Sequence, residues 1–303
     1  MKPIFTHLLT LPALLLLALT TPAHAALNVL TCEPEWAALT QELGGDRVKI
    51  ASATTALQDP HRVEARPSLI ARARNAGLLV CTGADLEIGW LPILLRESAN
   101  PLIQPGQPGN FEAAQYVTLL EKPARLDRAD GDVHAAGNPH IQTDPRNIGR
   151  VADALTARLV SIDPANAAYY DARHSAFKIR WNTAIGRWES AAAPLRGVAI
   201  AVQHKAFPYL QAWLGLREVA ALEPLPGVEP SVAALASVLE RLKRTPVKMV
   251  IRAAYSSPRA SQWISGRAGI AAVELPFTVG GTPGAKDLFG LFDDTIARLL
   301  KAN

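Results

Sequence analysis

The sequence predicts an α/β protein in which two doubly wound parallel-sheet lobes are joined by one long helix. Short β-type runs alternate with helical segments in both halves of the chain, and one helical stretch of unusual length separates the halves. Strands that alternate with helices form parallel sheets that helices cover on both faces. We therefore expect an N-terminal lobe over residues 26–162, a linking helix over 163–194 and a C-terminal lobe over 195–303.

Composition and charge exclude several classes of protein. The 303 residues are 49% hydrophobic and contain 2 cysteines, which excludes a disordered chain and a disulfide-dense miniprotein. The formal net charge of +4 comes from 31 basic and 27 acidic residues spread along the chain. An excess so small and so dispersed gives no reason to expect a nucleic-acid partner.

The first 25 residues have the pattern of a cleaved signal peptide. Lys2 precedes an apolar run over residues 8–19, and Ala23-His24-Ala25 matches a small-residue cleavage site. The run is too short to cross a bilayer core of ~30 Å at ~1.5 Å per residue. We expect cleavage after Ala25, export of the chain and no membrane span in the mature protein.

The N-terminal lobe begins with a strand, a helix and a strand, expected over residues 28–31, 33–43 and 48–52. The helix ends at Gly44-Gly45, a pair typical of a helix C-terminus. Further elements are a helix over 67–75, a strand over 78–81, a helix around 90–96, a loop over 101–109 and an amphipathic helix over 147–162.

The linking helix is predicted over residues 164 to about 193. Five apolar side chains at steps of three, four and seven residues form one stripe along it, namely Tyr170, Phe177, Trp181, Ile185 and Trp188. Stripes at this spacing are usually core, so we expect the helix to pack through them. The C-terminal lobe then carries strands over 198–202, 248–251 and 272–275 and helices over 206–214, 231–244, 258–266 and 287–300.

Three histidines occupy the loops where open parallel sheets bind their ligands. His61 and His140 directly follow a proline, and His204 follows the strand over 198–202. A stiff loop lowers the entropy cost of holding an imidazole ready, and three neutral imidazoles suit zinc. The alternative for each is a solvated surface histidine. His174, inside the long helix, is expected to be solvated, and His134 is a candidate for delivering metal to the site.

Four short motifs resemble those of the periplasmic zinc- and manganese-binding proteins of bacterial ABC importers. They are Asp59-Pro60-His61, Gly137-Asn138-Pro139-His140 with Asp144-Pro145-Arg146-Asn147, His204-Lys205-Ala206-Phe207, and Gly227-Val228-Glu229-Pro230-Ser231. The resemblance covers the mature chain. It implies two α/β lobes on a rigid helix, metal in the cleft between them, and the ligands His61, His140 and His204. Histidine rather than glutamate at the third position favours zinc over manganese.

The fourth metal ligand stays open. The family often supplies a carboxylate after the last strand, but residues 276–281 contain no acid. Asp287 is the nearest candidate downstream, but its position favours a cap on the closing helix over a metal ligand, and a water or no fourth ligand is also open. The family's long histidine-rich loop is replaced by residues 124–137, which carry one histidine with Asp127, Asp130 and Asp132.

The two cysteines, Cys32 and Cys81, each lie at the end of a predicted strand. First and third strands are commonly neighbours in a doubly wound sheet, which favours a disulfide, and an oxidising periplasm would preserve it. The alternative is two buried free thiols.

The resemblance implies a periplasmic, monomeric carrier that captures zinc and hands it to a membrane permease with a cytoplasmic ATPase. A binding protein for manganese or another divalent metal is the nearest alternative. A secreted zinc hydrolase is a rival from another class, but HExxH, GxSxG and P-loop patterns are all missing from the sequence. A third hypothesis is an adhesin or accessory protein with a structural metal.

Overall fold

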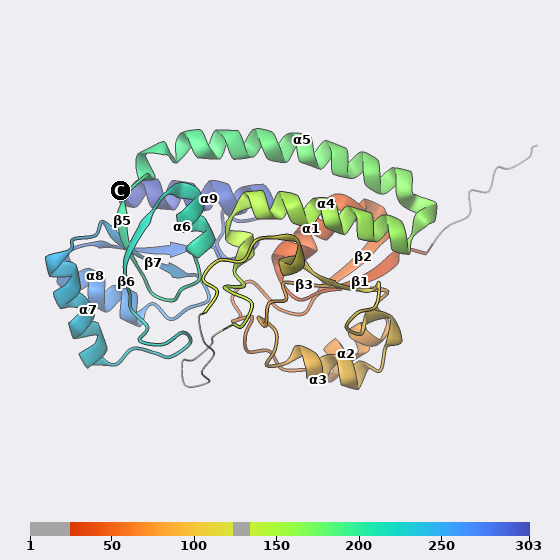
Figure 1. Cartoon of the computed structure of the whole chain (residues 1–303), viewed down its shortest axis with the longest axis horizontal. Coiled ribbons are helices and arrows are strands. Elements are labelled where there is room, and N and C mark those ends of the chain that lie inside the picture. The colour runs from red at the N-terminus through yellow and green to blue at the C-terminus, as the bar shows by residue number, and fades with distance from the viewer. Residues whose placement is uncertain (1–24, 124–133) are drawn as a thin grey trace, which may run out of the picture.

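The computed structural model describes residues 25–123 and 134–303, which form two α/β lobes side by side beneath one long helix (Figure 1). The expected signal peptide, apart from Ala25, and the expected acidic loop with Asp127, Asp130 and Asp132 lie outside the described residues. In the part that is described, no helix is long and apolar enough to cross a membrane.

The first lobe is built on a four-stranded parallel sheet with the order β2-β1-β3-β4. Its strands are β1 (Leu27–Thr31), β2 (Val48–Ser52), β3 (Leu78–Cys81) and β4 (Asn110–Glu112). Its helices are α1 (Pro34–Gly44), α2 (Pro67–Arg74), α3 (Leu91–Ser98) and α4 (Pro145–Ile162). The first and third strands are neighbours, as the sequence led us to expect.

The second lobe repeats this plan with the strand order β6-β5-β7-β8, again all parallel. Its strands are β5 (Ala199–Val202), β6 (Arg217–Ala221), β7 (Met249–Ala253) and β8 (Ala271–Leu275). Its helices are α6 (Pro208–Leu214), α7 (Val232–Arg244), α8 (Arg259–Ala268) and α9 (Leu288–Ala302). The two-lobed α/β fold is thus confirmed.

Two strands, β4 and β6, were not predicted from the sequence. Both are edge strands, and neither has strong β propensity: β4 has three residues after a proline- and glycine-rich loop, and β6 reads Arg-Glu-Val-Ala-Ala. Pairing with the buried neighbours β3 and β5 holds them in place. Both segments therefore become strands because of tertiary pairing, and not because of their own sequence.

The long helix α5 (Ala167–Ala191) runs along both lobes (Figure 1). It has 25 residues, and short 3₁₀ turns at Pro164–Asn166 and Ala193–Leu195 account for the rest of the predicted span. It contacts α1 and α4 in the first lobe and α9 in the second. Tyr170, Phe177, Trp181 and Trp188 in its stripe are each at most 1% exposed, so the stripe is core, as expected.

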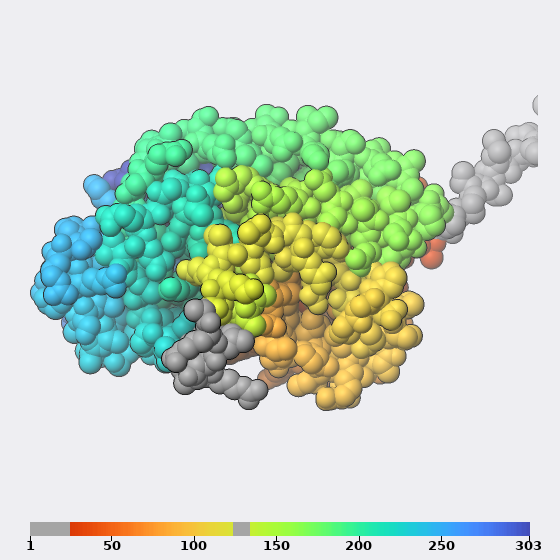
Figure 2. Space-filling view, in the orientation of Figure 1, coloured from red at the N-terminus to blue at the C-terminus, as the bar shows by residue number. Residues whose placement is uncertain are grey.

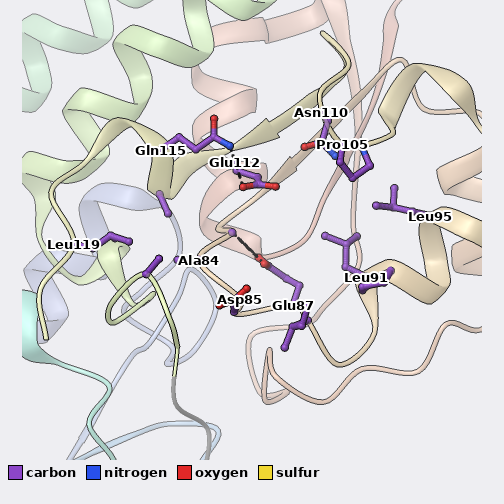
Figure 3. Close-up of a pocket in the computed structure, with 15 residues that line it drawn as sticks. Ala84, Asp85, Glu87, Leu91, Leu95, Pro105, Asn110, Glu112, Gln115 and Leu119 are labelled. Atoms are coloured by element: carbon purple, nitrogen blue, oxygen red, sulfur yellow. Dashed lines mark hydrogen bonds between the residues drawn. The ribbon is translucent and has the colours of Figure 1, made fainter. Parts of the chain in front are cut away.

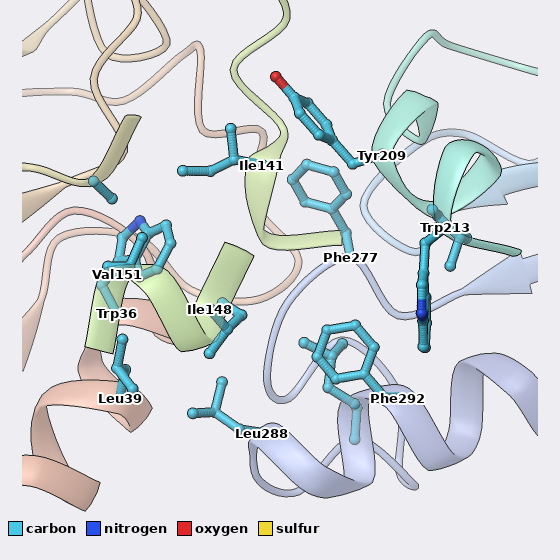
Figure 4. Packing of buried hydrophobic residues seen from close by; sticks show 14 of the residues in the cluster. Trp36, Leu39, Ile141, Ile148, Val151, Tyr209, Trp213, Phe277, Leu288 and Phe292 are labelled. Atoms are coloured by element: carbon cyan, nitrogen blue, oxygen red, sulfur yellow. The ribbon is translucent and has the colours of Figure 1, made fainter. Parts of the chain in front are cut away.

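One hydrophobic cluster extends through both lobes instead of stopping at their boundary. Trp36 and Leu39 from α1, and Ile148 and Val151 from α4, belong to the same cluster as side chains of the second lobe (Figure 4). The second-lobe members shown there are Tyr209, Trp213, Phe277, Leu288 and Phe292. The lobes therefore share a core, which holds the loops between them in a fixed relation.

Cys32 and Cys81 form a disulfide with their α-carbons 4.7 Å apart, which confirms the predicted bond. It joins the carboxyl ends of the neighbouring strands β1 and β3. His174 differs from expectation: its side chain is only 19% exposed, and its Nε2 lies 2.7 Å from Oδ1 of Asp153 on α4. A carboxylate on the helix packed beside α5 gave no signal in the local sequence.

Candidate metal centre

Three of the predicted histidines converge between the lobes. The ring centroids of His61 and His140, from the first lobe, are 5.4 Å apart. The ring of His204, from the second lobe, lies 6.0 Å from that of His61 and 5.7 Å from that of His140. One nitrogen of each ring lies within 4.8 Å of one nitrogen of the other two. The two lobes therefore contribute jointly to one cluster of nitrogen donors.

The two first-lobe histidines are presented by the same local device. In Asp59-Pro60-His61 and in Asn138-Pro139-His140, the side-chain oxygen of the first residue accepts the backbone N–H of the histidine, at 3.0 Å in both cases. Such a turn is typical of Asp and Asn, and the proline between them fixes its own backbone φ. The order Asp or Asn, Pro, His within each motif thus fixes the backbone conformation at each histidine.

A carboxylate orients the ring of His61. Oδ1 of Asp59 lies 2.8 Å from Nδ1 of His61, while Nε2 of His61 is buried and has no hydrogen-bond partner among the described residues. Burial acts to raise the pKa of Asp59, but the hydrogen bonds with His61 outweigh it, so the pKa ends below its ordinary value. Asp59 is therefore ionised and directs the Nε2 lone pair into the cluster.

The same arrangement recurs at His204, where Oε2 of Glu223 lies 2.7 Å from Nδ1 of the ring. The backbone N–H of Gly227 donates to the same oxygen at 2.9 Å. Val202 and Ala221 are register partners in β5 and β6, and His204 and Glu223 each follow two residues later. Sequence reasoning missed Glu223 because it missed β6. Ligands of open parallel sheets bind beyond the carboxyl ends of the strands, so identifying β6 would have drawn attention to Glu223.

His140 is the most buried of the three, with 1% of its surface exposed. Burial holds the pKa of His140 well below its usual range, and the neighbouring histidines His61, His204 and His134 lower it further. The ring packs edge-on against Phe277 with centroids 5.2 Å apart, and its Nδ1 has no hydrogen-bond partner within the described residues. His140 is therefore a neutral imidazole, the form that binds metal.

The geometry fits a tetrahedral zinc ion. Zinc bound at ~2.0–2.1 Å holds its nitrogen ligands roughly 3.4 Å apart. The ring nitrogens of the three histidines already lie within 4.8 Å of one another, so each needs to shift by less than about 1 Å. A buried nitrogen without a partner costs free energy, and a metal ion would satisfy it. Three imidazoles, two of them oriented by carboxylates, are the donor set found around zinc in proteins.

His134 lies closer to the cluster than the sequence indicated. Its ring centroid is 5.4 Å from that of His61 and 6.5 Å from that of His140. Asp287, in contrast, caps helix α9: its Oδ1 accepts the backbone N–H of Gly290 at 2.7 Å. Of its two expected roles, the structure shows the capping one for Asp287.

The cluster is reached through a cavity of about 310 Å³. First-lobe residues line it on one side and second-lobe residues on the other, including Glu121, His134, His140, His204 and Lys205. Asn138 joins the two sides, since its Nδ2 donates to the backbone oxygen of Lys205 at 2.9 Å. In the space-filling view, the yellow-green segment that follows residue 134 lies between the two lobes (Figure 2).

Comparison with known proteins places the chain among metal carriers. It is 23% identical over 276 residues to the zinc-binding lipoprotein AdcA of Streptococcus pneumoniae, covering 89% of this chain and 54% of AdcA. The chain thus spans about half the length of that relative. It is 24% identical over 215 residues to the high-affinity zinc uptake system protein ZnuA of Bacillus subtilis, covering 70% of this chain and 66% of that protein.

A solved crystal structure of ZnuA has the same fold, with a TM-score of 0.76 and 22% sequence identity over 92% of this chain and all of the other. The profile of a family described as the periplasmic component A of the zinc-uptake complex, ZnuA, matches residues 29–302. That family comprises components of metal uptake and is not a family of enzymes. From its fold, its histidine cluster and this match, the chain belongs to the ZnuA family of periplasmic zinc-uptake components.

Proposed function

We propose that this protein captures Zn²⁺ in the periplasm and delivers it to an inner-membrane ABC permease driven by a cytoplasmic ATPase. The observation that carries the proposal is the convergence of His61, His140 and His204 from both lobes, with ring nitrogens within 4.8 Å. Family membership and the zinc-binding names of its relatives support the same function. The mechanism is reversible coordination, and no bond of a substrate is broken.

The donor set supports zinc as the cargo. His61, His140 and His204 offer nitrogen, while the nearby carboxylates of Asp59 and Glu223 are engaged with ring nitrogens. Manganese prefers oxygen ligands, so a site of three imidazoles discriminates against it. We propose that His134 or a water molecule completes the tetrahedron.

Binding should weaken in acid. An imidazole must be neutral to donate its lone pair, so the zinc affinity should fall as the pH is lowered and protons compete for the ring nitrogens. Burial lowers the pKa of His140, which keeps that ring neutral in more acidic solution than a free imidazole. We propose that contact with the permease triggers zinc release, without acidification of the periplasm.

Zinc binding is tested by equilibrium dialysis of the mature chain against Zn²⁺ and Mn²⁺ in competition. We expect one zinc per chain and preference for zinc, with both lost in the triple variant His61→Ala, His140→Ala, His204→Ala. His174→Ala is the matched control, since its ring pairs with Asp153 away from the cluster. Retention of wild-type zinc affinity by the triple variant would refute the proposal.

Delivery is tested in cells that lack the gene for this chain. Zinc uptake should return with the wild-type protein and not with the triple variant, and the protein recovered from the periplasm should begin at Ala26. Zinc binding without any role in uptake would instead favour an accessory protein or adhesin. Hydrolysis of an amide, ester or phosphate by the zinc-loaded chain would favour the hydrolase.

A further inference from the structure

The first lobe contains a second cavity, of about 530 Å³, that the zinc site does not use. It lies beyond the carboxyl ends of β3 and β4, the position at which open parallel sheets bind ligands. Its size falls within the range of small-molecule sites, roughly 300–1,000 Å³. None of the clustered histidines lines it, so it is a cavity distinct from the one beside the zinc site.

The walls combine apolar surface with acidic side chains. Leu91, Leu95 and Pro105 gather on one side, next to the carboxyl groups of Glu87 and Glu112 (Figure 3). Asp85 adds a third carboxylate, and the remaining polar groups are the amides of Asn110 and Gln115. None of the described residues that line the cavity is basic. In a chain with a net positive charge, this is a locally acidic, partly apolar site.

The three carboxylates are not consumed by ion pairs within the described part of the chain. Glu87 accepts the backbone N–H groups of Thr82 and Gly83, and Glu112 accepts the side-chain amide of Gln115 at 3.0 Å. Asp85, which is exposed, accepts the backbone N–H of Ala135 at 3.3 Å. Among residues 25–123 and 134–303, Asp85 and Glu112 therefore have no cationic partner, and a bound cation would supply one.

The backbone is shaped to bring these groups together. Gly83, Ala84 and Asp85 all have positive φ, of 75°, 51° and 64°. A Cβ on Gly83 would lie 2.9 Å from Cβ of Glu112, closer than real side chains approach, so glycine is needed for Glu112 to occupy its place. Left-handed backbone at Ala84 is unfavourable by roughly 1–2 kcal/mol, and such conformations cluster at binding sites.

An anionic ligand is disfavoured even though helix α3 begins at the cavity wall. A free helix N-terminus attracts anions through unpaired N–H groups. Here the N–H groups of Trp90 and Leu91 both donate to the backbone oxygen of Glu87, at 3.1 and 2.8 Å. The helix presents Leu91 and Pro92 to the cavity instead of free donors, so the carboxylates determine the sign of the ligand.

We propose that this cavity binds a small amphipathic cation: a primary ammonium group held by Asp85 and Glu112, on a short alkyl chain that packs against Leu91 and Leu95. An ammonium group supplies the donors that the carboxylates lack, and the alkyl chain covers apolar wall that water cannot satisfy. The site is independent of zinc capture, so neither proposal depends on the other.

The test is an NMR titration of the full mature, zinc-loaded protein with n-hexylamine, with n-hexanol and hexanoate as isosteric neutral and anionic probes. We expect saturable shifts of the Gly83, Ala84 and Gln115 amides with hexylamine, and binding at least about fivefold weaker for the other two probes. Equal binding of hexanol, or no saturable shift at these amides, would overturn the proposal.

Charge variants localise the cation. The double variant Asp85→Asn, Glu112→Gln should bind hexylamine about fivefold more weakly, since a partly exposed ion pair contributes modestly. Glu97→Gln, on the exposed side of α3 beside Arg96, is the matched control and should bind as the parent does. Unchanged zinc stoichiometry shows that each variant is folded. A double variant that is folded and binds hexylamine with unchanged affinity would overturn the assignment.

The same ammonium chemistry also exists on a lysine side chain of another protein. N-acetyl-lysine N-methylamide, which carries a butylammonium group on a peptide backbone, is therefore titrated in parallel. A free-amine site should prefer hexylamine. Tighter binding of the lysine derivative would overturn the assignment in favour of a docked polypeptide.

Discussion

Glu35 is a buried carboxyl group at the junction of the lobes. It lies in the first turn of α1, is 1% exposed, and accepts a hydrogen bond from the hydroxyl of Thr278 in the second lobe. Burial raises the pKa of Glu35 to about 7, although the hydrogen bonds from Thr278 and from its own backbone act in the opposite direction. Glu33 and Glu87, buried nearby, also have raised pKa values, and burial is the main cause in both.

The sign of the effect on stability follows from the direction of the shift. Between pH 4.5 and about 7 the folded protein keeps a proton on Glu35 that the unfolded chain releases. The stabilising contribution is therefore complete below pH 4.5 and is lost as the pH rises through 7. At ~1.36 kcal/mol for each pH unit, about 2–3 kcal/mol of it disappears between pH 5 and pH 8.

Glu35→Gln removes this titration while keeping an oxygen that can accept from Thr278. We expect its free energy of unfolding to be close to that of the parent at pH 5 and to exceed that of the parent by about 2–3 kcal/mol at pH 8. Urea denaturation at 25 °C with a metal chelator, repeated at pH 5, 6, 7 and 8, measures this difference directly.

Glu64→Gln is the matched control, because it makes the same chemical change on an exposed loop. Its difference from the parent should not vary with pH by more than a few tenths of a kcal/mol. If the Glu35→Gln difference were equally flat from pH 5 to pH 8, the reasoning from burial would be refuted.

Three further predictions follow from the metal centre and the disulfide. His140→Ala should weaken zinc binding at least about a hundredfold by calorimetric titration, with His174→Ala unchanged; equal effects of the two would contradict the site. Glu223→Gln should weaken zinc binding about 10–100-fold with stoichiometry preserved, because it loosens a ring without removing it. Unaltered affinity would show that this carboxylate does not orient its histidine. Serine at both Cys32 and Cys81 should lower the free energy of unfolding by up to about 4 kcal/mol, as expected for a bond closing a loop of 49 residues, and leave zinc stoichiometry unchanged. Loss of metal in that variant would indicate that the sulfurs act on the site.

The fold could be predicted because its information is local. Alternating strands and helices identify both lobes, and the aromatic stripe of α5 identifies the long helix. The edge strand β6 could not be predicted, since its residues favour a strand only beside β5. That omission concealed Glu223, whose place next to His204 exists only through the pairing of the two strands.

The part of the site that could be predicted is the part determined by local sequence. The Asx-Pro-His motifs contain their own backbone hydrogen bonds, so His61 and His140 could be selected from the sequence. The position of His134 depends on tertiary packing, which no local sequence pattern records. For Asp287, capping and metal binding require the same residue type at the same place, and only the position of the cluster separates them.

The hydrophobic cluster common to both lobes has a consequence for how the protein unfolds. Trp36 of the first lobe and Phe292 of the second are members of one buried set, with helix α5 packed along both. Each lobe also has a smaller buried cluster of its own, but separating the lobes would expose the shared set to water, so the two cores are not independent. Heating should therefore melt the chain in a single cooperative transition, with calorimetric and van't Hoff enthalpies equal, and zinc should raise the melting temperature of the first-lobe helices as much as that of the second.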